Sequence, residues 1–264
     1  MRQYFKDKTD IKVAIAVDKN DRAEKAARAL RKTMSFVPMK EADILLVLGG
    51  DGFMLRHFRQ LTDEGLKIPI YGMNRGSVGF LLNHFSSKDL MARLQNAIEV
   101  ELHPLKVTVE TKDGQIITAF AFNELSLIRK NEQAAHLNII IDDKPCLTDM
   151  MSDGLVVSTP AGSTAYNFAC DGPILPLGAS ILAMTPISVF RPRRWRGAIL
   201  RNKSKIKITM QHYEKRPVNA AVDGMLVGEA IAVDVCEDKS NYMSVLFDPD
   251  LSLDERIFKE QFMA

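Results

Sequence analysis

The sequence predicts a small doubly wound α/β domain at the N-terminus, followed by a larger and mostly antiparallel β-rich domain. In the first hundred residues, buried-strand patterns alternate with helix-period patterns, as they do in chains that form parallel sheets. Beyond Leu102-His103-Pro104, short strand-like runs dominate and helix-period stretches become scarce. We therefore expect an α/β domain over residues 1–100 and a β-rich domain over 101–239, with the tail 240–264 returning to the first domain.

Strand and helix patterns alternate along the expected α/β domain. Apolar runs predict buried strands at 13–17, 44–48 and 69–72. Apolar residues at helical spacing predict helices at 22–32, from Phe53 to Leu61 and from Leu90 to Ile98.

The expected β-rich domain begins with a hairpin. The runs 107–111 and 116–122 flank Asp113-Gly114, and Asp-Gly is a strong turn signal between strands. Further strand patterns occur at 137–141, 206–210, 218–222 and 231–235. A strand-like run at 243–247 and a helical pattern from Leu253 make up the tail that we expect to rejoin the first domain.

Composition indicates an ordinary soluble globular protein. Of the 264 residues, 46% are hydrophobic, and 35 Lys and Arg against 33 Asp and Glu give a formal net charge of +2, which does not favour nucleic-acid or anionic-membrane binding. No stretch reaches the roughly 18 apolar residues of a membrane-spanning helix, and the charged N-terminus is unlike a signal peptide. The three cysteines form no C-x-x-C pair, so we expect neither a zinc site nor disulfides, and a cytoplasmic protein.

A glycine-rich turn with one carboxylate, Gly49-Gly50-Asp51-Gly52, follows the second predicted strand. Glycines let backbone N–H groups point at a phosphate beside a helix N-terminus, so Gly49, Gly50 and Gly52 are candidate phosphate-binding residues. A carboxylate repels phosphate, so Asp51 is expected to handle a metal ion or to take a proton from an attacking hydroxyl. The alternative is a tight connection that holds no ligand. The chain has no G-x-x-x-x-G-K-[ST] loop and no Rossmann glycine spacing.

Residues 153–167 form a second candidate site, in which a strand pattern runs into a turn rich in hydroxyl groups. Small donors and acceptors come from Ser158, Thr159, Ser163 and Thr164. Gly162 permits a close approach, and the ring of Tyr166 suits a nucleotide. The alternative is that Ser163 or Thr164 caps a short helix. We favour a binding role because so many hydroxyl groups share one turn.

Three other segments allow more than one interpretation. Asn123-Glu124 can hydrogen-bond ribose hydroxyls or a base edge, although the pair alone would be a surface turn. His136 is expected to be a satisfied or solvated histidine and not a catalyst. Arg191–Arg196 is the densest positive segment; it suits phosphate oxygens, or else it is a solvated loop or a subunit contact anchored by Trp195.

Taken in order along the chain, four motifs resemble those of the bacterial NAD kinase (ATP-NAD kinase) family. They are Gly49-Gly50-Asp51-Gly52, Gly79-Phe80-Leu81, Asn123-Glu124, and the segment from Asp153-Gly154 through Ser158 to Tyr166. The glycine turn alone is shared with lipid kinases and, loosely, with phosphofructokinases, whereas the hydroxyl-rich motif is much more specific. The resemblance covers most of the chain.

The resemblance implies transfer of the γ-phosphate of ATP to the 2′-hydroxyl of the adenosine ribose of NAD, giving NADP, with a divalent cation such as Mg²⁺. It implies that Asp51 is the general base, and it leaves metal ligands unassigned. The NAD-binding residues that it implies are Asp51, Gly52, Phe80, Asn123, Glu124, Asp153, Ser163, Thr164, Ala165, Tyr166, Asn167 and Ala169. Members of the family assemble as dimers or tetramers, so we expect a homodimer or homotetramer with NAD near the subunit contacts.

Departures from the family pattern keep other functions open. Phe53 replaces the threonine that often follows the turn, Cys170-Asp171 stands where a glycine pair is common, and the histidine often found beyond Ser188 is absent. A nucleotide-binding sensor that keeps the fold but lacks phosphoryl transfer is the alternative. A lipid kinase rests on the glycine turn alone and ranks last, because the sequence has no basic amphipathic helix or membrane anchor.

Overall fold

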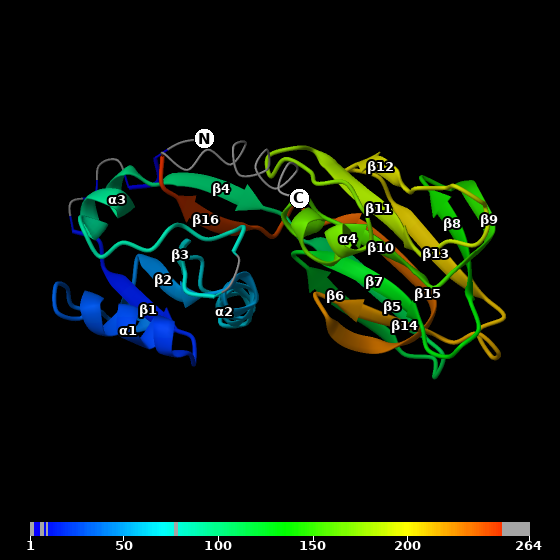
Figure 1. Ribbon diagram of the computed structural model, residues 1–264, viewed down its shortest axis with the longest axis horizontal. Helices are drawn as coiled ribbons and strands as arrows, with labels where there is room; N and C mark the ends of the chain where they lie inside the picture. Colours follow the sequence, from blue (N-terminus) through cyan, green and yellow to red (C-terminus); the bar gives the residue numbers. More distant parts are fainter. Residues whose placement is uncertain (1–2, 6–7, 9, 77–78, 250–264) are drawn as a thin grey trace. The chain divides into compact units, whose positions relative to one another are not determined.

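The computed structural model describes residues 3–5, 8, 10–76 and 79–249, and the chain divides into two compact units. Unit 1 runs to Leu102 and resumes at Met243, whereas unit 2 comprises His103–Tyr242 (Figure 1). The helical tail predicted from Leu253 lies outside the described residues. Unit 1 is therefore built from two segments of the chain, one before unit 2 and one after it.

Within the described residues, unit 1 is built on a five-stranded sheet in the order β1-β2-β3-β16-β4. The strands are β1 (Val13–Val17), β2 (Ile44–Gly49), β3 (Ile70–Asn74), β4 (Ile98–Leu102) and β16 (Met243–Phe247). β1, β2, β3 and β16 run parallel, and β4 pairs antiparallel with β16. The expected parallel sheet is confirmed, as is the return of residues 243–247 to it.

Helices cover both faces of this sheet, as a doubly wound domain requires. α1 (Asp21–Leu30) and α3 (Leu90–Asn96) pack through alanines and leucines on the face that carries Leu46 and Tyr71. Successive strand residues point to opposite faces. Gly72 therefore points to the face opposite that of Tyr71. A Cβ added at Gly72 would lie 3.1 Å from the sulfur of Met54, a residue of α2 (Asp51–Asp63), so α2 covers this second face.

The third predicted helix is too long. α3 ends at Asn96, Ala97 is extended, and Ile98 begins β4. Ile98 lies opposite Phe247 of β16, so pairing with a strand distant in the sequence overrides the helical spacing of the apolar residues.

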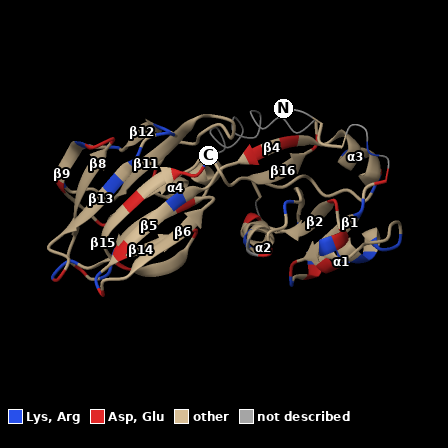
Figure 2. Cartoon of the chain, turned by 180° about the vertical axis from the view of Figure 1, so that it is seen from behind, with Lys and Arg blue, Asp and Glu red and all other residues tan. Residues whose placement is uncertain are grey.

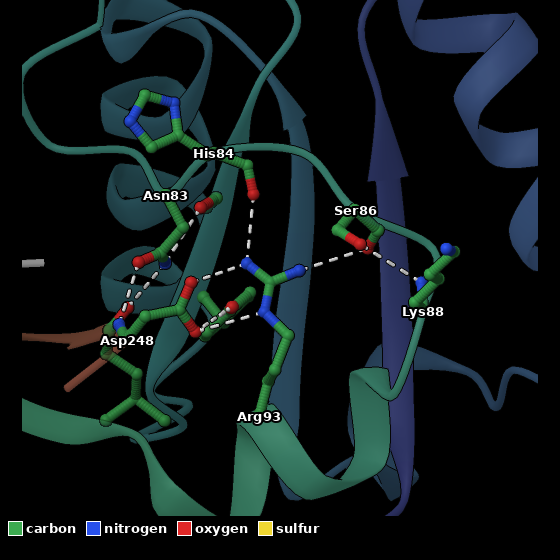
Figure 3. A network of polar contacts seen from close by, with 9 residues as sticks. Asn83, His84, Ser86, Lys88, Arg93 and Asp248 are labelled. Carbon is green, nitrogen blue, oxygen red and sulfur yellow. Dashed lines mark hydrogen bonds and ion pairs between the residues drawn. The ribbon is translucent and has the colours of Figure 1, made fainter. Parts of the chain in front are cut away.

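A polar network holds the end of β16 in unit 1 (Figure 3). The Asp248 carboxylate accepts hydrogen bonds from Arg93 Nη2 at 2.5 Å and from the Tyr71 hydroxyl at 2.6 Å. Arg93 also donates to the backbone carbonyls of His84 and Ser86. Burial and the hydrogen bond to Asp248 raise the pKa of Tyr71, so its hydroxyl remains a donor.

Asn83 extends the network into the sheet. Its side-chain oxygen accepts the backbone N–H of Asp248 at 2.9 Å, and its amide group donates to the carbonyls of Gly72 and Leu246. Asn83 is fully buried, so all of these bonds form away from water. The loop before Asn83 is thereby attached to both β3 and β16.

Unit 2 is an antiparallel β structure, and its described residues form an eleven-stranded sheet. Nine strands follow in the order β12-β11-β10-β7-β14-β15-β13-β8-β9, and the β5–β6 hairpin joins through β5 to β15. The strands are β5 (Leu105–Thr111), β6 (Ile116–Ala121), β7 (Glu124–Arg129), β8 (Ala135–Ile141), β9 (Lys144–Ser152), β10 (Gly154–Ser158), β11 (Ile181–Ile187), β12 (Ala198–Arg201), β13 (Ile206–Gln211), β14 (Val218–Val222) and β15 (Met225–Glu237).

The local predictions for unit 2 fit this architecture. Gly114 has φ +80° in the β5–β6 turn, so the Asp113-Gly114 hairpin is confirmed. One apolar face of the curved sheet forms a single core that includes Leu127, Val157 and Val233. A short 3₁₀ turn, η2 (Ala161–Thr164), and α4 (Tyr166–Ala169) follow β10.

Charges of both signs are interspersed over the two units, for example on α1 (Figure 2). This distribution agrees with a net charge of +2 and gives no broad field of one sign. Among the helices in the described part of the chain, none combines the length and the apolar character needed to cross a bilayer.

We predict that Asp248→Ala lowers the free energy of unfolding by about 3 kcal/mol, because it leaves the mostly buried Arg93 charge without its partner. Glu214→Ala is the control, since it removes an exposed partner of Lys112 and is expected to leave the free energy of unfolding nearly unchanged. Urea denaturation of both variants measures the difference. Equal losses in the two variants would contradict the structural role of Asp248.

Candidate functional site

The glycine turn joins β2 to α2 at the carboxyl end of a parallel strand. Gly50 is the N-cap residue of α2, with an extended backbone (φ −106°, ψ 175°), and no side chain within the described residues caps the helix. A helix N-terminus that is not capped by a side chain presents N–H groups and positive potential to an anion. The turn therefore has the local structure that the sequence predicts for a phosphate site.

Asp51, the first residue of α2, is held in a fixed orientation. Its Oδ2 accepts the backbone N–H of Phe80 at 2.7 Å, and its Oδ1 accepts that of Leu81 at 3.1 Å. Phe80, predicted as a ligand contact, thus also positions Asp51 through its backbone. A carboxylate held in this way can act as a proton acceptor in general-base chemistry.

The glycines of the turn differ in what they make possible. A Cβ at Gly50 or Gly52 would meet no described atom within 4 Å, so both leave space in front of the backbone. A Cβ at Gly49 would lie 2.7 Å from Cδ1 of Phe53. Gly49 is therefore required for packing, and Gly50 and Gly52 are free to face a ligand.

Asp223 of unit 2, which is not among the residues predicted from the sequence, organises the Asn123-Glu124 pair. Its carboxylate accepts the backbone N–H groups of Phe122 at 3.0 Å, Asn123 at 2.7 Å and Glu124 at 3.2 Å. Its own N–H donates to the Glu124 carbonyl at 3.0 Å. The available signal was an Asp-Gly pair, Asp223-Gly224, between two strand patterns, which resembles the Asp51-Gly52 pair.

The first hydroxyl groups of the second motif bind backbone. Thr159 Oγ1 donates to the Phe122 carbonyl at 2.6 Å and accepts the Gly162 N–H at 3.1 Å. Ser158 donates to the Thr159 carbonyl at 2.9 Å. Both residues are buried, so these hydroxyl groups attach the motif to the Asn123 segment.

Gly162 is needed because the Asn123 backbone lies directly against it. A Cβ at position 162 would come within 2.1 Å of the Asn123 carbonyl oxygen and 2.4 Å of its Cα. The close approach expected at Gly162 is thus made by backbone of the same unit. It brings the two motifs of unit 2 together.

Ser163 and Asn167, predicted to contact NAD, are fully buried and hydrogen-bonded to protein groups in and beyond the turn. Ser163 Oγ donates to the Pro160 carbonyl at 2.7 Å and accepts the Leu175 N–H at 2.9 Å. The Asn167 amide donates to the Pro173 carbonyl, and its oxygen accepts the Thr185 hydroxyl at 2.7 Å. Their side chains shape the turn; contact with NAD stays a prediction.

The alternative interpretation, in which Ser163 or Thr164 caps a short helix, is wrong. η2 and α4 have Pro160 and Ala165 at their N-cap positions, and no side chain among the described residues caps either segment. The buried Ser163 hydroxyl is already engaged by Pro160 and Leu175, so it is not available for a helix terminus.

The other residues predicted around NAD remain accessible. Thr164 and Ala165 are half-buried, Ala169 is exposed, and the Tyr166 side chain is 36% exposed. The backbone N–H of Tyr166 donates to the Glu124 carboxylate, so the two motifs meet at these residues. This part of unit 2 combines a buried carboxylate with an accessible aromatic ring, as a nucleotide site requires.

Glu124 is the electrostatically unusual group of this site. Burial, and to a smaller extent the nearby Asp223 charge, raise the pKa of its carboxyl to about 7, while the Tyr166 N–H opposes the shift. Its Oε2 is buried and has no hydrogen-bond partner in the described part of the chain. An orphaned carboxylate oxygen beside Tyr166 is a ready acceptor for a ligand hydroxyl or amide.

Asp153 lies at the far end of the same strands. Gly154 pairs with Ile128 at one end of β10, whereas Ser158 pairs with Glu124 at the other. Four residues of strand span about 13 Å. Asp153 bonds Arg129 Nε at 2.6 Å, so within one chain the structure does not bring Asp153 beside Glu124.

The residues that depart from the family pattern pack beside the two motifs. The Phe53 ring meets His57 edge to face, with centroids 4.5 Å apart. The Cys170 thiol hydrogen-bonds the Tyr166 hydroxyl, and burial raises the pKa of Cys170. Both residues therefore line the predicted sites.

The remaining candidates are His136 and the segment Arg191–Arg196. His136 Nδ1 lies 2.5 Å from Asp149 Oδ1, but its buried Nε2 has no hydrogen-bond partner in the described part of the chain, so the expected satisfied histidine is only partly confirmed. The arginines of Arg191–Arg196 are exposed, and Trp195 packs against the core of unit 2. Arginines exposed in a single chain fit a solvated loop, a subunit contact and a phosphate site equally, so all three interpretations stay open.

Comparison with known proteins identifies both halves of the chain. The profile described as ATP-NAD kinase N-terminal domain matches residues 2–102, and the one described as ATP-NAD kinase C-terminal domain matches residues 122–240. The chain is 44% identical to an NAD kinase of Rhizorhabdus wittichii over 254 residues, which is 96% of this chain and 99% of that one. It is 45% identical to an NAD kinase of Rhizobium meliloti over 242 residues, 92% and 93% of the two chains.

Solved structures show the same fold at low sequence identity. The crystal structure of yeast NADH kinase complexed with NADH matches with a TM-score of 0.76 and 21% identity, covering 96% of this chain and 88% of that one. An NAD kinase from Archaeoglobus fulgidus in complex with ATP matches with a TM-score of 0.75 and 19% identity, covering 95% and 98%.

We predict that Gly162→Ala destabilises unit 2 by about 3 kcal/mol, because the new methyl group would overlap the Asn123 backbone, which is held on both sides. Gly178→Ala is the matched control: it is exposed, and its Cβ would meet no described atom within 4 Å. Thermal unfolding of the two variants measures the effect. The packing argument fails if Gly162→Ala melts at the temperature of Gly178→Ala.

The raised pKa of Glu124 predicts a pH-dependent stability. Because the folded-state pKa lies above the unfolded value, the contribution is fully present below about pH 4.3 and is lost as the pH rises through about 7. Relative to Glu124→Gln, the parent protein should lose about 1.4 kcal/mol for each pH unit in that window. Urea denaturation across the window tests this, with the exposed Glu214→Gln as control; parallel curves for the parent and Glu124→Gln would rule it out.

Proposed function

The chain belongs to the NAD kinase family and catalyses the ATP-dependent phosphorylation of NAD to NADP, and we propose that Asp51 is its general base. The observation that carries this proposal is the Asp51 carboxylate at the start of α2, aimed by the N–H groups of Phe80 and Leu81 beside an open glycine turn. A base and a phosphate site share one turn.

The proposed step is a direct transfer. The Asp51 carboxylate takes the proton of the ribose 2′-hydroxyl as the 2′-oxygen forms a bond to the γ-phosphorus. The bond between that phosphorus and the bridging oxygen breaks, and ADP leaves with the electron pair. A ribose hydroxyl is a poor nucleophile at neutral pH, and the transfer depends mainly on alignment and charge neutralisation. A fixed carboxylate supplies the proton acceptor and the alignment.

Unit 2 supplies the groups that we propose to hold NAD. Asn123 and Glu124 are fixed by Asp223, and the unpartnered Glu124 Oε2 would accept a hydrogen bond from NAD. Tyr166 offers an exposed ring to a base. Thr164, Ala165 and Ala169 would line the pocket, as the family resemblance implies.

A divalent cation, Mg²⁺, is part of the proposal. Within the described residues, no group of three or more His, Cys, Asp or Glu is arranged to hold a metal ion. Mg²⁺ keeps several waters and is commonly bound through one or two carboxylates together with substrate phosphates. A single carboxylate such as Asp51 is therefore compatible with a cation that enters bound to ATP. The cation would neutralise the charge of the phosphates.

We also propose a homodimer or homotetramer, with NAD near the subunit contacts. Asp153 and Glu124 lie at opposite ends of β10 in one chain. If both contact the same NAD, two subunits can supply them without any change in the strand.

The three cysteines are free, which supports a reducing compartment such as the cytoplasm.

We predict that Asp51→Asn lowers kcat for NADP formation by about 10²–10⁴-fold, because the amide cannot take the proton. NAD binding measured by calorimetry should be retained. Asp43→Asn is the control: it also changes an aspartate of unit 1 that accepts a backbone N–H, from Lys12 at 2.8 Å, and should keep activity within about twofold.

The same assay tests the alternatives. Full activity in Asp51→Asn would refute the role as base. Binding of NAD and ATP by the parent protein without NADP formation would instead favour the nucleotide-binding sensor, and transfer to a lipid would favour the lipid kinase.

A further inference from the structure

Two arginines that have no carboxylate partner within the described residues lie beside the glycine turn of unit 1. Arg22 is in the first turn of α1, and Arg75 directly follows β3. The backbone N–H of Arg75 donates to the Gly49 carbonyl at 2.8 Å, and a Cβ at Gly76 would lie 3.3 Å from the Gly50 Cα. The segment that carries Arg75 therefore packs against the turn itself.

The Arg75 guanidinium is held in place but is not neutralised. Its Cζ lies 3.7 Å from the centroid of the Phe85 ring, and this stacking fixes the plane of the group. Its Nε is buried and has no hydrogen-bond partner in the described part of the chain. Burial lowers the pKa of Arg75, and the positive charge of Arg22 lowers it further.

Arg22 provides the second charge. It is exposed, and its Nη1 reaches the Gly76 carbonyl at 3.5 Å. Neither arginine forms an ion pair among the described residues. The Asp51 carboxylate in the turn is directed at the N–H groups of Phe80 and Leu81 instead. Two neighbouring cations, one partly desolvated, are stabilised when an anion bridges them.

We propose that Arg22 and Arg75 bind the phosphate chain of the donor, so that unit 1 selects the donor by its polyanionic tail. This inference rests on the phosphoryl transfer proposed above. Guanidinium groups match phosphate oxygens with two parallel hydrogen bonds, and the N-terminus of α2 offers N–H donors in the turn against which the Arg75 backbone packs. The chemical class that fits is a chain of linked phosphates, with or without a nucleoside at its end.

Inorganic tripolyphosphate is the probe that tests this proposal without catalysis. Calorimetric titration into the full-length protein, in the absence of NAD, should give binding that Arg22→Ala and Arg75→Ala each weaken by about tenfold or more. In the kinase assay the KM for ATP should rise by a similar factor, while the KM for NAD stays within about twofold. Arg75→Lys keeps the charge but not the planar fork, so it should fall between Arg75→Ala and the parent protein.

Arg28→Ala is the matched control, because Arg28 is an exposed arginine in the last turn of the same helix as Arg22. It removes the same charge and should leave tripolyphosphate binding unchanged. If Arg75→Ala does not fold, the exposed Arg22→Ala carries the test alone. Thermal unfolding of each variant establishes which case applies.

Three results would overturn the proposal. These are unchanged tripolyphosphate binding in the arginine variants that fold, an equal loss in Arg28→Ala, and a rise in the KM for NAD without one for ATP. The last would assign the arginine pair to the acceptor. Because tripolyphosphate binding does not depend on turnover, the result of the binding test is independent of whether Asp51 proves to be the base.

Discussion

The position of β16 between β3 and β4 is the constraint on which the rest of unit 1 depends. Met243 lies opposite Leu102, so the chain must complete all of unit 2 before the sheet can close. The bonds of Asp248 to Arg93 and of its N–H to Asn83 hold the returning strand. Contacts this far apart in sequence form only after a large loss of chain entropy, so they need strong partners.

The same constraint reaches the proposed base. Asn83 bonds both Gly72 of β3 and Leu246 of β16, and this fixes the end of the loop that contains Phe80 and Leu81. The N–H groups of that loop orient Asp51. A C-terminal strand therefore contributes to the placement of a carboxylate nearly two hundred residues earlier in the chain, without touching it.

The two units use a similar device. In each, an aspartate followed by glycine accepts backbone N–H groups from a neighbouring segment: Asp51 from Phe80 and Leu81, and Asp223 from Phe122, Asn123 and Glu124. Hydrogen bonds to a carboxylate are shorter and stronger than those between neutral groups, so they fix these segments. The hydroxyl-rich motif is also mainly structural, since its buried Ser158, Thr159 and Ser163 hydroxyl groups hydrogen-bond to backbone groups. These bonds explain why so many small polar residues occur together in the motif. The accessible surface comes from their neighbours.

The sequence by itself determined the local elements and the family. Strands at 13–17, 218–222 and 243–247 have the predicted bounds, and the glycine turn joins a strand to a helix as expected, because hydrophobic period and backbone freedom are local properties. Only the tertiary structure decided which strands pair and that Ile98 belongs to a strand and not to a helix. It also decided that Asp223 supports Glu124, and that Asp153 lies at the opposite end of β10 from Glu124. It also placed Arg22 beside Arg75. These features depend on residues brought together across long stretches of chain, where pairing, burial and charge act between groups whose proximity no local pattern encodes.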